Sequence, residues 1–238
     1  MSTYLQTHIK FIKGVGPNRA EMLGNHLGIV TIADLLSHYP VRYEDRSKIH
    51  KVSELSDGIS IQLAGNISFS GWEGEGRSKR LKAWFADDTG KVELVWFTGG
   101  KWIEEKVREG GRYILFGKPQ IYRNSFSIAH PELEDAEKYV ARGATGLVPI
   151  YPLTEQLRKR KIDSKTLSDI IRNALDMQEF SLPETLPYDI LQKHHYVSKS
   201  EAIRELHVPT KTENLEKAQA RLKYEEIFYL QLRHLILK

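Results

Sequence analysis

Two large aromatic residues stand side by side at the end of an alternating stretch, KVELVWFTGG, at residues 91–100. Successive side chains on a strand point to opposite faces, so Trp96 and Phe97 cannot both enter one core. Val92, Leu94 and Trp96 continue the apolar alternation best, which predicts that Phe97 is the exposed ring. An exposed ring here can stack on a nucleic-acid base, a contact worth roughly 1–3 kcal/mol. Alternatively, Phe97 packs on a neighbouring helical element.

Two short clusters of basic residues are candidates for phosphate binding. One cluster is RSKRLK at residues 77–82, and the other is RKRK at residues 158–161. In a chain of net charge +4, such clusters permit nucleic-acid binding without requiring it. Solvated loops are the alternative interpretation of both. The candidates for phosphate contacts near the predicted strands are Arg77, Lys79, Arg80 and Lys82.

A glycine-rich turn precedes the first predicted helix, in IKGVGPNRA. Pro17 suits the first turn of a helix, because its missing N–H would be unpaired there anyway. Gly14 and Gly16 could leave backbone N–H groups pointing at a phosphate oxygen, as in helix-hairpin-helix modules. The alternative is that the two glycines only supply the backbone angles of a helix-packing turn. The sequence leaves both interpretations open.

Signatures of catalysis are missing from the sequence. The Gly-Lys pairs are followed by Val92, Trp102 and Pro119, whereas a phosphate-binding loop needs serine or threonine there. The sequence has no Gly-x-Ser-x-Gly elbow and no histidine pair with metal-ligand spacing, and it contains no cysteine. We therefore predict a binding protein with no catalytic residue, no metal site and no cofactor of its own.

The middle of the chain has the pattern of several short strands. Residues 59–70 alternate, and Gly65 inside them predicts a bulge or a bend. Further strands are expected at 81–86, 92–97 and 112–117, with a bent strand or hairpin over 120–130. About five strands separated by glycine-containing turns are typical of the five-stranded Greek-key barrel called the OB-fold. The apolar residues expected to share one face of the first strand are Ile59, Ile61, Leu63, Ile67 and Phe69.

Helical patterns flank these strands. Short helices are expected over 18–25 and 31–39, the second stopped before Pro40, and a long helix from about Asn214 to the end. Residues 163–177 form an amphipathic pattern, whose inward positions are Leu167, Ile170, Ile171, Ala174 and Leu175. The predicted fold class is α+β, a five-stranded OB-fold β-barrel flanked by helical segments at both ends. Four regions are expected: a helical region with the glycine turn (1–50), the barrel (51–150), a mixed helical linker (151–213) and the last helix (214–238).

The sequence shows no sign of export or of a membrane span, because it lacks an apolar signal segment and any run of about 18 apolar residues. A cytoplasmic location is expected. Eight of the eleven residues from Ile227 to Leu237 are apolar. A helix that is apolar on most sides is normally buried. This end should therefore pack back on the chain or be covered by a part outside it.

Six stretches occur in the order seen in the N-terminal part of RecG helicases, namely GVGPNRAEML, DLLSHYPVRYEDRS, DDTGKVELVWF, HPELE, GLVPIYPLTE and ARLKYEEIFYLQL. Each stretch is short, but their order and spacing over residues 10 to 238 are specific. On these motifs the chain resembles the RecG family of bacterial ATP-dependent DNA helicases.

The resemblance implies a wedge domain that grips the branch point of replication forks and Holliday junctions during recombination and repair. It implies that the aromatic pair at Trp96 and Phe97 stacks on bases at the fork. The expected partners are branched DNA and, in cis, the helicase motor domains, which the last helix would contact. Those domains, outside this chain, would bind ATP and magnesium and hydrolyse ATP. No membrane partner is expected.

Two other functions fit the residues without the resemblance. An OB-fold module for RNA or for single strands in general would show little preference for forks. A protein-interaction domain would use the aromatic residues and the last helix on a partner, and would show no salt-dependent binding to DNA.

Overall fold

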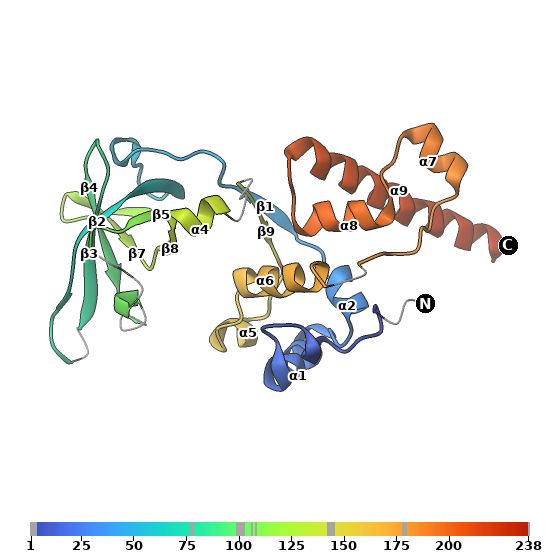
Figure 1. Cartoon of the computed structure of the whole chain (residues 1–238), viewed down its shortest axis with the longest axis horizontal. Helices are drawn as coiled ribbons and strands as arrows, with labels where there is room; N and C mark the ends of the chain where they lie inside the picture. Colours follow the sequence, from blue (N-terminus) through green and yellow to red (C-terminus); the bar gives the residue numbers. More distant parts are fainter. Residues whose placement is uncertain are drawn as a thin grey trace. The chain divides into compact units, whose positions relative to one another are not determined.

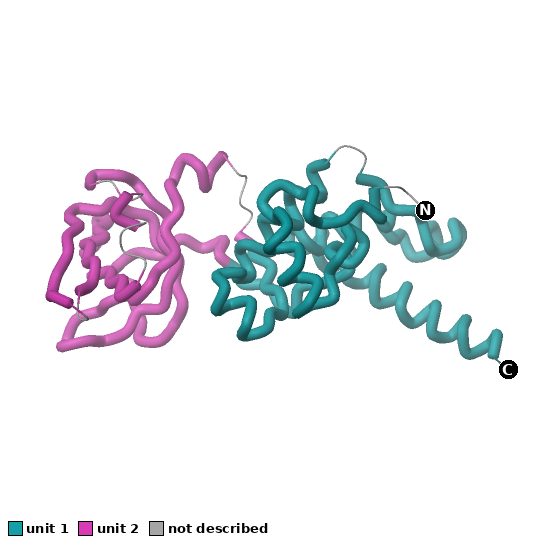
Figure 2. The backbone as a smooth tube through the Cα atoms, turned by 90° about the horizontal axis from the view of Figure 1, so that it is seen from below, with its two compact units in different colours: residues 1–45, 147–238 teal, residues 46–146 magenta. Residues whose placement is uncertain are grey.

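The chain forms two compact units in the computed structural model, which describes residues 4–76, 79–98, 103–105, 107, 109–141, 146–177 and 180–237. Unit 1 combines Met1–Asp45 with Leu147–Lys238, and unit 2 is the continuous segment Arg46–Gly146 (Figure 2). The expected regions 1–50 and 151–238 thus belong largely to one unit. The finer division into four regions remains a prediction.

Unit 2 contains a mixed sheet that has seven strands in its described part (Figure 1). The strand order is β6-β7-β4-β3-β2-β5-β8, and β4 and β7 form the one parallel pair among them. A short 3-10 helix, Val52–Glu54, precedes the sheet and α4, Ala136–Ala141, follows it. The strands are β2 (Ile61–Glu73), β3 (Arg80–Ala86), β4 (Lys91–Trp96), β5 (Arg112–Gly117), β6 (Pro119–Tyr122), β7 (Ser125–Ala129) and β8 (Glu132–Asp135).

The strand count differs from the five that were expected, while the α+β class is confirmed. The expected bent strand or hairpin is the β6–β7 hairpin, which closes on Arg123 and Asn124, both at positive φ. Strand β8 was not predicted. Only Lys118 separates β5 from β6, so one short run of chain pairs with β2 at one place in the sheet and with β7 at another.

The core of unit 2 lies on one face of these strands. Alternate residues of β2, β3 and β4 fill it, as the period of two requires. Gly117 lies against Ile128 so closely that a Cβ at this glycine would be only 2.4 Å from the Ile128 Cγ2. The fully buried residues of the unit 2 core include Leu63, Ile67, Phe85, Leu94, Leu115 and Ile128.

The prediction that the five apolar residues of the first strand share one face is wrong at both ends of the strand. Ile59 precedes β2 and is exposed, and Phe69 is 54% exposed. Ile61, Leu63 and Ile67 are buried as expected. The pairing of β2 with β3 shifts between Ile67 and Phe69, and one extra residue reverses the face of every residue after it. The bulge thus lies at Ser68 and not at Gly65, where the sequence predicted a bulge or a bend.

Unit 1 is built mainly from helices and contains a short two-stranded ribbon (Figure 1). The ribbon pairs β1 (Arg42–Asp45) with β9 (Leu147–Ile150) in antiparallel fashion. A 3-10 helix, Ile9–Phe11, precedes the first helix. The helices are α1 (Gly16–Leu27), α2 (Ile32–Ser37), α5 (Glu155–Lys159), α6 (Ser164–Leu175), α7 (Tyr188–His194), α8 (Lys199–His207) and α9 (Thr212–Ile236).

The amphipathic helix α6 is the centre of the unit 1 core, and its five predicted inward residues are all buried. Asp163 caps α6 by accepting a hydrogen bond from the Thr166 N–H. Thr31 and Asp34 form a capping box at the start of α2. Such caps satisfy backbone N–H groups that a helix start leaves unpaired, and each stabilises by about 1 kcal/mol. The predicted helices at 18–25 and 31–39 are confirmed, the first longer and the second shorter at both ends.

The long helix α9 is held to unit 1 by a buried arginine near its middle. The Arg221 guanidinium is fully buried and pairs with Glu184 and Glu225, while Lys199 also reaches Glu225. Beyond this network the helix extends away from the rest of unit 1 (Figure 2). Its apolar end is left uncovered by the described residues, with Ile227, Leu230, Leu235 and Ile236 all exposed. Within the described chain, no helix combines the length and apolarity needed to cross a membrane.

Candidate nucleic-acid interface

The end of β4 separates the two neighbouring aromatic rings. Trp96 is 3% exposed and belongs to the unit 2 core, and Phe97, directly after the strand, is 58% exposed. The predicted orientation of both rings is therefore confirmed. Trp96 pairs in register with Leu81 of β3, which is also buried. The buried tryptophan fixes the backbone from which the phenylalanine projects.

A histidine that the sequence pattern did not single out lies beside Phe97. The rings of Phe97 and His130 have centroids 5.7 Å apart and planes inclined at 53°. The parallel pairing of Val95 with Ala129 brings the two chain segments together, and the His130 N–H donates to the Val95 carbonyl at 2.8 Å. His130 has a positive φ of 48°. The sequence pointed to His130 only through the HPELE motif. The parallel pairing of β4 with β7 joins distant segments and leaves no local pattern in the sequence.

Two of the predicted phosphate-binding cations already have carboxylate partners. Arg80 donates to Glu73, with its Nη2 2.9 Å from Glu73 Oε2. The Lys82 Nζ lies 2.7 Å from a carboxylate oxygen of Glu73 and 2.7 Å from one of Glu93. These four residues come from three adjacent strands, and register brings them together: Glu73 pairs with Arg80. The sequence showed the cations but not the acids opposite them.

The pairing changes the proton affinities at this place. Hydrogen bonds from Lys82 and Arg80 hold the pKa of the Glu73 carboxyl below its usual range. Hydrogen bonds to Glu73 and Glu93 raise the pKa of the Lys82 ammonium. Both shifts favour the ionised forms of Glu73 and Lys82, and the two carboxylates offset the positive charge of Arg80 and Lys82. A phosphate would have to compete with Glu73 for both cations.

Lys79 is placed differently from the other cations. Its Nζ lies 4.8 Å from the centre of the Trp72 ring, and it forms no ion pair with a described residue. The Trp72 indole N–H donates to Glu104 at 2.9 Å. Lys79 therefore keeps an uncompensated charge above an aromatic surface. Arg77, the fourth predicted cation, lies outside the described residues.

The predicted glycine turn is in unit 1, before α1. Gly14 and Gly16 have φ of 91° and 63°, conformations that favour glycine. The Arg19 side chain donates to the Gly14 carbonyl at 2.6 Å, and the Asn173 amide donates to the Lys13 carbonyl at 2.9 Å. These contacts explain the turn as a helix-packing element. Its predicted role in phosphate binding has no further support in the contacts.

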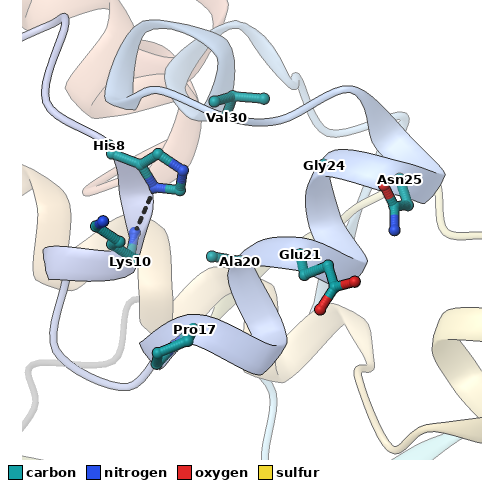
Figure 3. A pocket seen from close by; sticks show the side chains of 8 residues that line it. All are labelled: His8, Lys10, Pro17, Ala20, Glu21, Gly24, Asn25 and Val30. Carbon is teal, nitrogen blue, oxygen red and sulfur yellow. Dashed lines mark hydrogen bonds between the residues drawn. The ribbon is translucent and has the colours of Figure 1, made fainter.

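Unit 1 also has an open pocket of about 470 Å³ beside α1 (Figure 3). The His8 Nδ1 accepts a hydrogen bond from the Lys10 N–H at its edge. None of the candidate site residues predicted from sequence lines the pocket, so it is not part of the candidate interface. Its lining consists of His8, Lys10, Pro17, Ala20, Glu21, Gly24, Asn25 and Val30.

An exposed aromatic ring at a strand end, on a mixed sheet joined to a helical unit, defines the chain as an α+β domain with a candidate binding surface. Comparison with known proteins makes the class specific. Residues 8–177 match the family model of the RecG wedge domain, and the chain belongs to that family.

Curated relatives agree with this assignment. The chain is 34% identical over 233 residues to the ATP-dependent DNA helicase RecG of Thermotoga maritima, covering 96% of this chain and 28% of the relative. It is 30% identical over 240 residues to the ATP-dependent DNA helicase RecG of Streptococcus pneumoniae, covering 100% of this chain and 33% of the relative. The chain thus spans about a third of the length of these relatives.

A solved structure of RecG bound to a three-way DNA junction is similar to the chain in fold. The two superpose with a TM-score of 0.79 at 32% sequence identity. The match covers 96% of this chain and 31% of that chain, so it includes both units.

Proposed function

We propose that this chain is the wedge module of a RecG-type ATP-dependent DNA helicase and that it binds branched DNA, such as replication forks and Holliday junctions, in recombination and repair. The observation that carries the proposal is the exposed Phe97 beside the buried Trp96, in a chain of the RecG wedge family. The likeness to a RecG structure with a three-way DNA junction supports branched DNA as the ligand.

In this mechanism unit 2 is a passive OB-type barrel that stands at the junction while duplex is pulled towards it. Phe97 stacks on the last base pair and offsets the stacking lost when the strands separate. The buried Trp96 holds the strand end in place and does not stack on DNA itself. His130 limits the directions in which the Phe97 ring can turn.

Phosphate contacts near the ring come from Lys79 first, because its charge has no carboxylate partner in the described chain. Arg80 and Lys82 exchange Glu73 for phosphate oxygens on binding, which costs part of the attraction. Arg77 is the fourth cation of this set. The glycine turn at Gly14 and Gly16 is a weaker candidate for a phosphate contact.

The whole protein would pull DNA with motor domains in cis that bind ATP and magnesium, and this chain would not hydrolyse ATP by itself. The uncovered apolar end of α9 fits a contact with those domains. A cytoplasmic location follows from this role.

The proposal is tested by measuring the affinity of the chain for a fork, a blunt duplex and a single strand over a salt series. Phe97→Ala should weaken fork binding by roughly 5- to 150-fold, which corresponds to the roughly 1–3 kcal/mol that one stacked base contributes. The matched control is Phe11→Ala, which removes another exposed phenylalanine, from unit 1. Trp96→Ala is unsuitable because it would open a cavity in the core.

Equal binding of all three DNA forms, unchanged by Phe97→Ala, would contradict the wedge role. Stronger binding to the same fork made of RNA would favour the RNA-binding alternative instead. Absence of any salt-dependent binding would favour the protein-interaction alternative.

A further inference from the structure

We propose that the end of α5 and the residues that follow it, together called the α5–α6 turn, form a second DNA-binding surface, which contacts the phosphate backbone of duplex DNA through four consecutive cations. These cations are Arg158, Lys159, Arg160 and Lys161. The inference rests on the proposed function, because it adds a contact to the same ligand. It concerns unit 1, whereas Phe97 and its neighbours belong to unit 2.

The turn is held rigidly by its two ends. Leu157 and Ile162 are buried in the unit 1 core, and the four cations between them are all exposed. The Ile162 N–H donates to the Leu157 carbonyl at 2.9 Å, and the Lys161 N–H donates to the Arg158 carbonyl at 3.0 Å. The backbone that carries the four charges is therefore ordered before any ligand binds, which lowers the entropic cost of binding.

The charges of this turn are almost uncompensated. Lys159 pairs with Glu155 at 3.2 Å, but both side chains are more than 70% exposed, and such pairs contribute little. Arg158, Arg160 and Lys161 form no ion pair with any residue that the structure describes. In unit 2, by contrast, Glu73 and Glu93 offset the charges of Arg80 and Lys82. The α5–α6 turn thus keeps a positive field that can attract phosphate.

Lys161 supports a role beyond folding. Its φ is 61°, in the left-handed region where glycine is the usual residue after a helix end. A lysine there has a conformational cost, and its exposed ammonium makes no contact in the described chain that would offset it. The fold alone would be served better by glycine. A requirement for positive charge at this position explains the lysine.

Duplex DNA suits this surface better than single-stranded DNA. Residues 155–165 contain no aromatic side chain on which an unpaired base could stack. Contacts from arginine and lysine alone are contacts to phosphate, and duplex DNA carries one charge for about every 1.7 Å of its axis. Helix α1 packs against α5, and Lys165 in the first turn of α6 is exposed too, so the duplex would lie near these helices.

The test measures the affinity of the whole chain for a blunt duplex and for a three-way junction over a salt series. The variant replaces all four cations, Arg158→Gln, Lys159→Gln, Arg160→Gln and Lys161→Gln. The control removes the same charge elsewhere in unit 1 from exposed lysines without ion pairs in the described chain, Lys193→Gln, Lys211→Gln, Lys217→Gln and Lys223→Gln.

We expect the slope of log affinity against log salt to fall by about 0.9 for each phosphate that the variant no longer neutralises, and duplex affinity to fall on the order of tenfold or more in low salt. The control should keep the wild-type slope. An unchanged slope in the variant, with normal junction binding by the wild type, would overturn this inference alone. Failure of the wild type to bind any DNA would overturn the proposed function as well.

Lys161→Gly separates the folding role from the binding role. We expect this variant to melt at the same temperature as the wild type or higher, and to bind duplex more weakly. A lower melting temperature with unchanged duplex affinity would show that Lys161 serves the fold, and would count against the inference.

Discussion

His207 is a histidine kept neutral inside unit 1. It is 1% exposed, its Nε2 lies 3.0 Å from the Leu36 carbonyl, and its Nδ1 lies 3.0 Å from the Tyr151 hydroxyl. A carbonyl can only accept, so Nε2 carries the proton and Nδ1 accepts from Tyr151. Burial lowers the pKa of His207 to about 4. Protonation would break the Tyr151 contact and leave a charge in the core.

Unit 1 should therefore lose stability in acid. The unfolded chain binds a proton at a histidine pKa of about 6.5 and the folded chain at about 4, so unfolding takes up protons between these values. The full stability is present above about pH 6.5, and about 3 kcal/mol is lost as the pH falls to 4. Urea unfolding followed by helical circular dichroism at several pH values measures this.

His207→Gln should be less stable near neutral pH and should lose most of the pH dependence between 6.5 and 4. His26→Gln, at an exposed position of α1, is the control and should keep the wild-type profile. An unchanged pH dependence in His207→Gln would assign the acid sensitivity to carboxylates such as Glu184 and Glu225. Their pKa values are also lowered in the folded state.

The sequence predicted those features of the candidate interface that depend only on the local pattern of residues. The period of two was enough to place Trp96 inside and Phe97 outside. The neighbour of Phe97, His130, comes from a distant part of the chain through a parallel pairing of strands. The carboxylates that offset Lys82 come from two other strands. Such long-range register is set by packing of the whole sheet and leaves no local signal.

The sequence predicted a helix or strand well when the same face of that element is buried along its whole length. Helix α6 keeps its apolar stripe from Leu167 to Leu175, and each of those five positions is buried. Strand β2 keeps its period only until Ser68, where the register shifts. A bulge adds one residue to one strand, and its position depends on the partner strand β3. The sequence therefore predicted the strand and misplaced its irregularity.

Gly65 has a steric role in β2 that differs from the predicted bulge. A Cβ at this position would lie 2.4 Å from the Ala86 carbonyl oxygen and 2.8 Å from the Phe85 ring, closer than real Cβ contacts. The backbone of β3 and a fully buried ring leave little room for relaxation. Gly65→Ala should destabilise unit 2 by about 1–3 kcal/mol through overpacking.

Tryptophan fluorescence measures this change selectively, because all four tryptophans lie between Trp72 and Trp102 in unit 2. Gly71→Ala in the same strand is the control. Its Cβ would lie 3.0 Å from the tip of the exposed Phe69 ring, which can move aside. Equal melting of the Gly65 and Gly71 variants would refute the steric role of Gly65.

At the scale of the whole molecule, unit 2 is an insertion into unit 1. Each unit has a hydrophobic core of its own, and the chain passes between them at residues 45–46 and 146–147. The two ends of the insertion leave unit 1 side by side, because Asp45 of β1 pairs with Leu147 of β9. A turn of two residues is the common connection between antiparallel strands paired in this way.

Replacing residues 46–146 by Asn-Gly should therefore close β1 and β9 into a hairpin and leave unit 1 folded. Helical circular dichroism should show one cooperative thermal transition, with no tryptophan left to contribute. This shortened chain should bind a blunt duplex with a salt dependence that the four substitutions at residues 158–161 reduce. It should show no preference for a three-way junction, because Phe97 is gone. A clear preference of the shortened chain for the junction would show that unit 1 recognises the branch point, and would contradict the role proposed for Phe97.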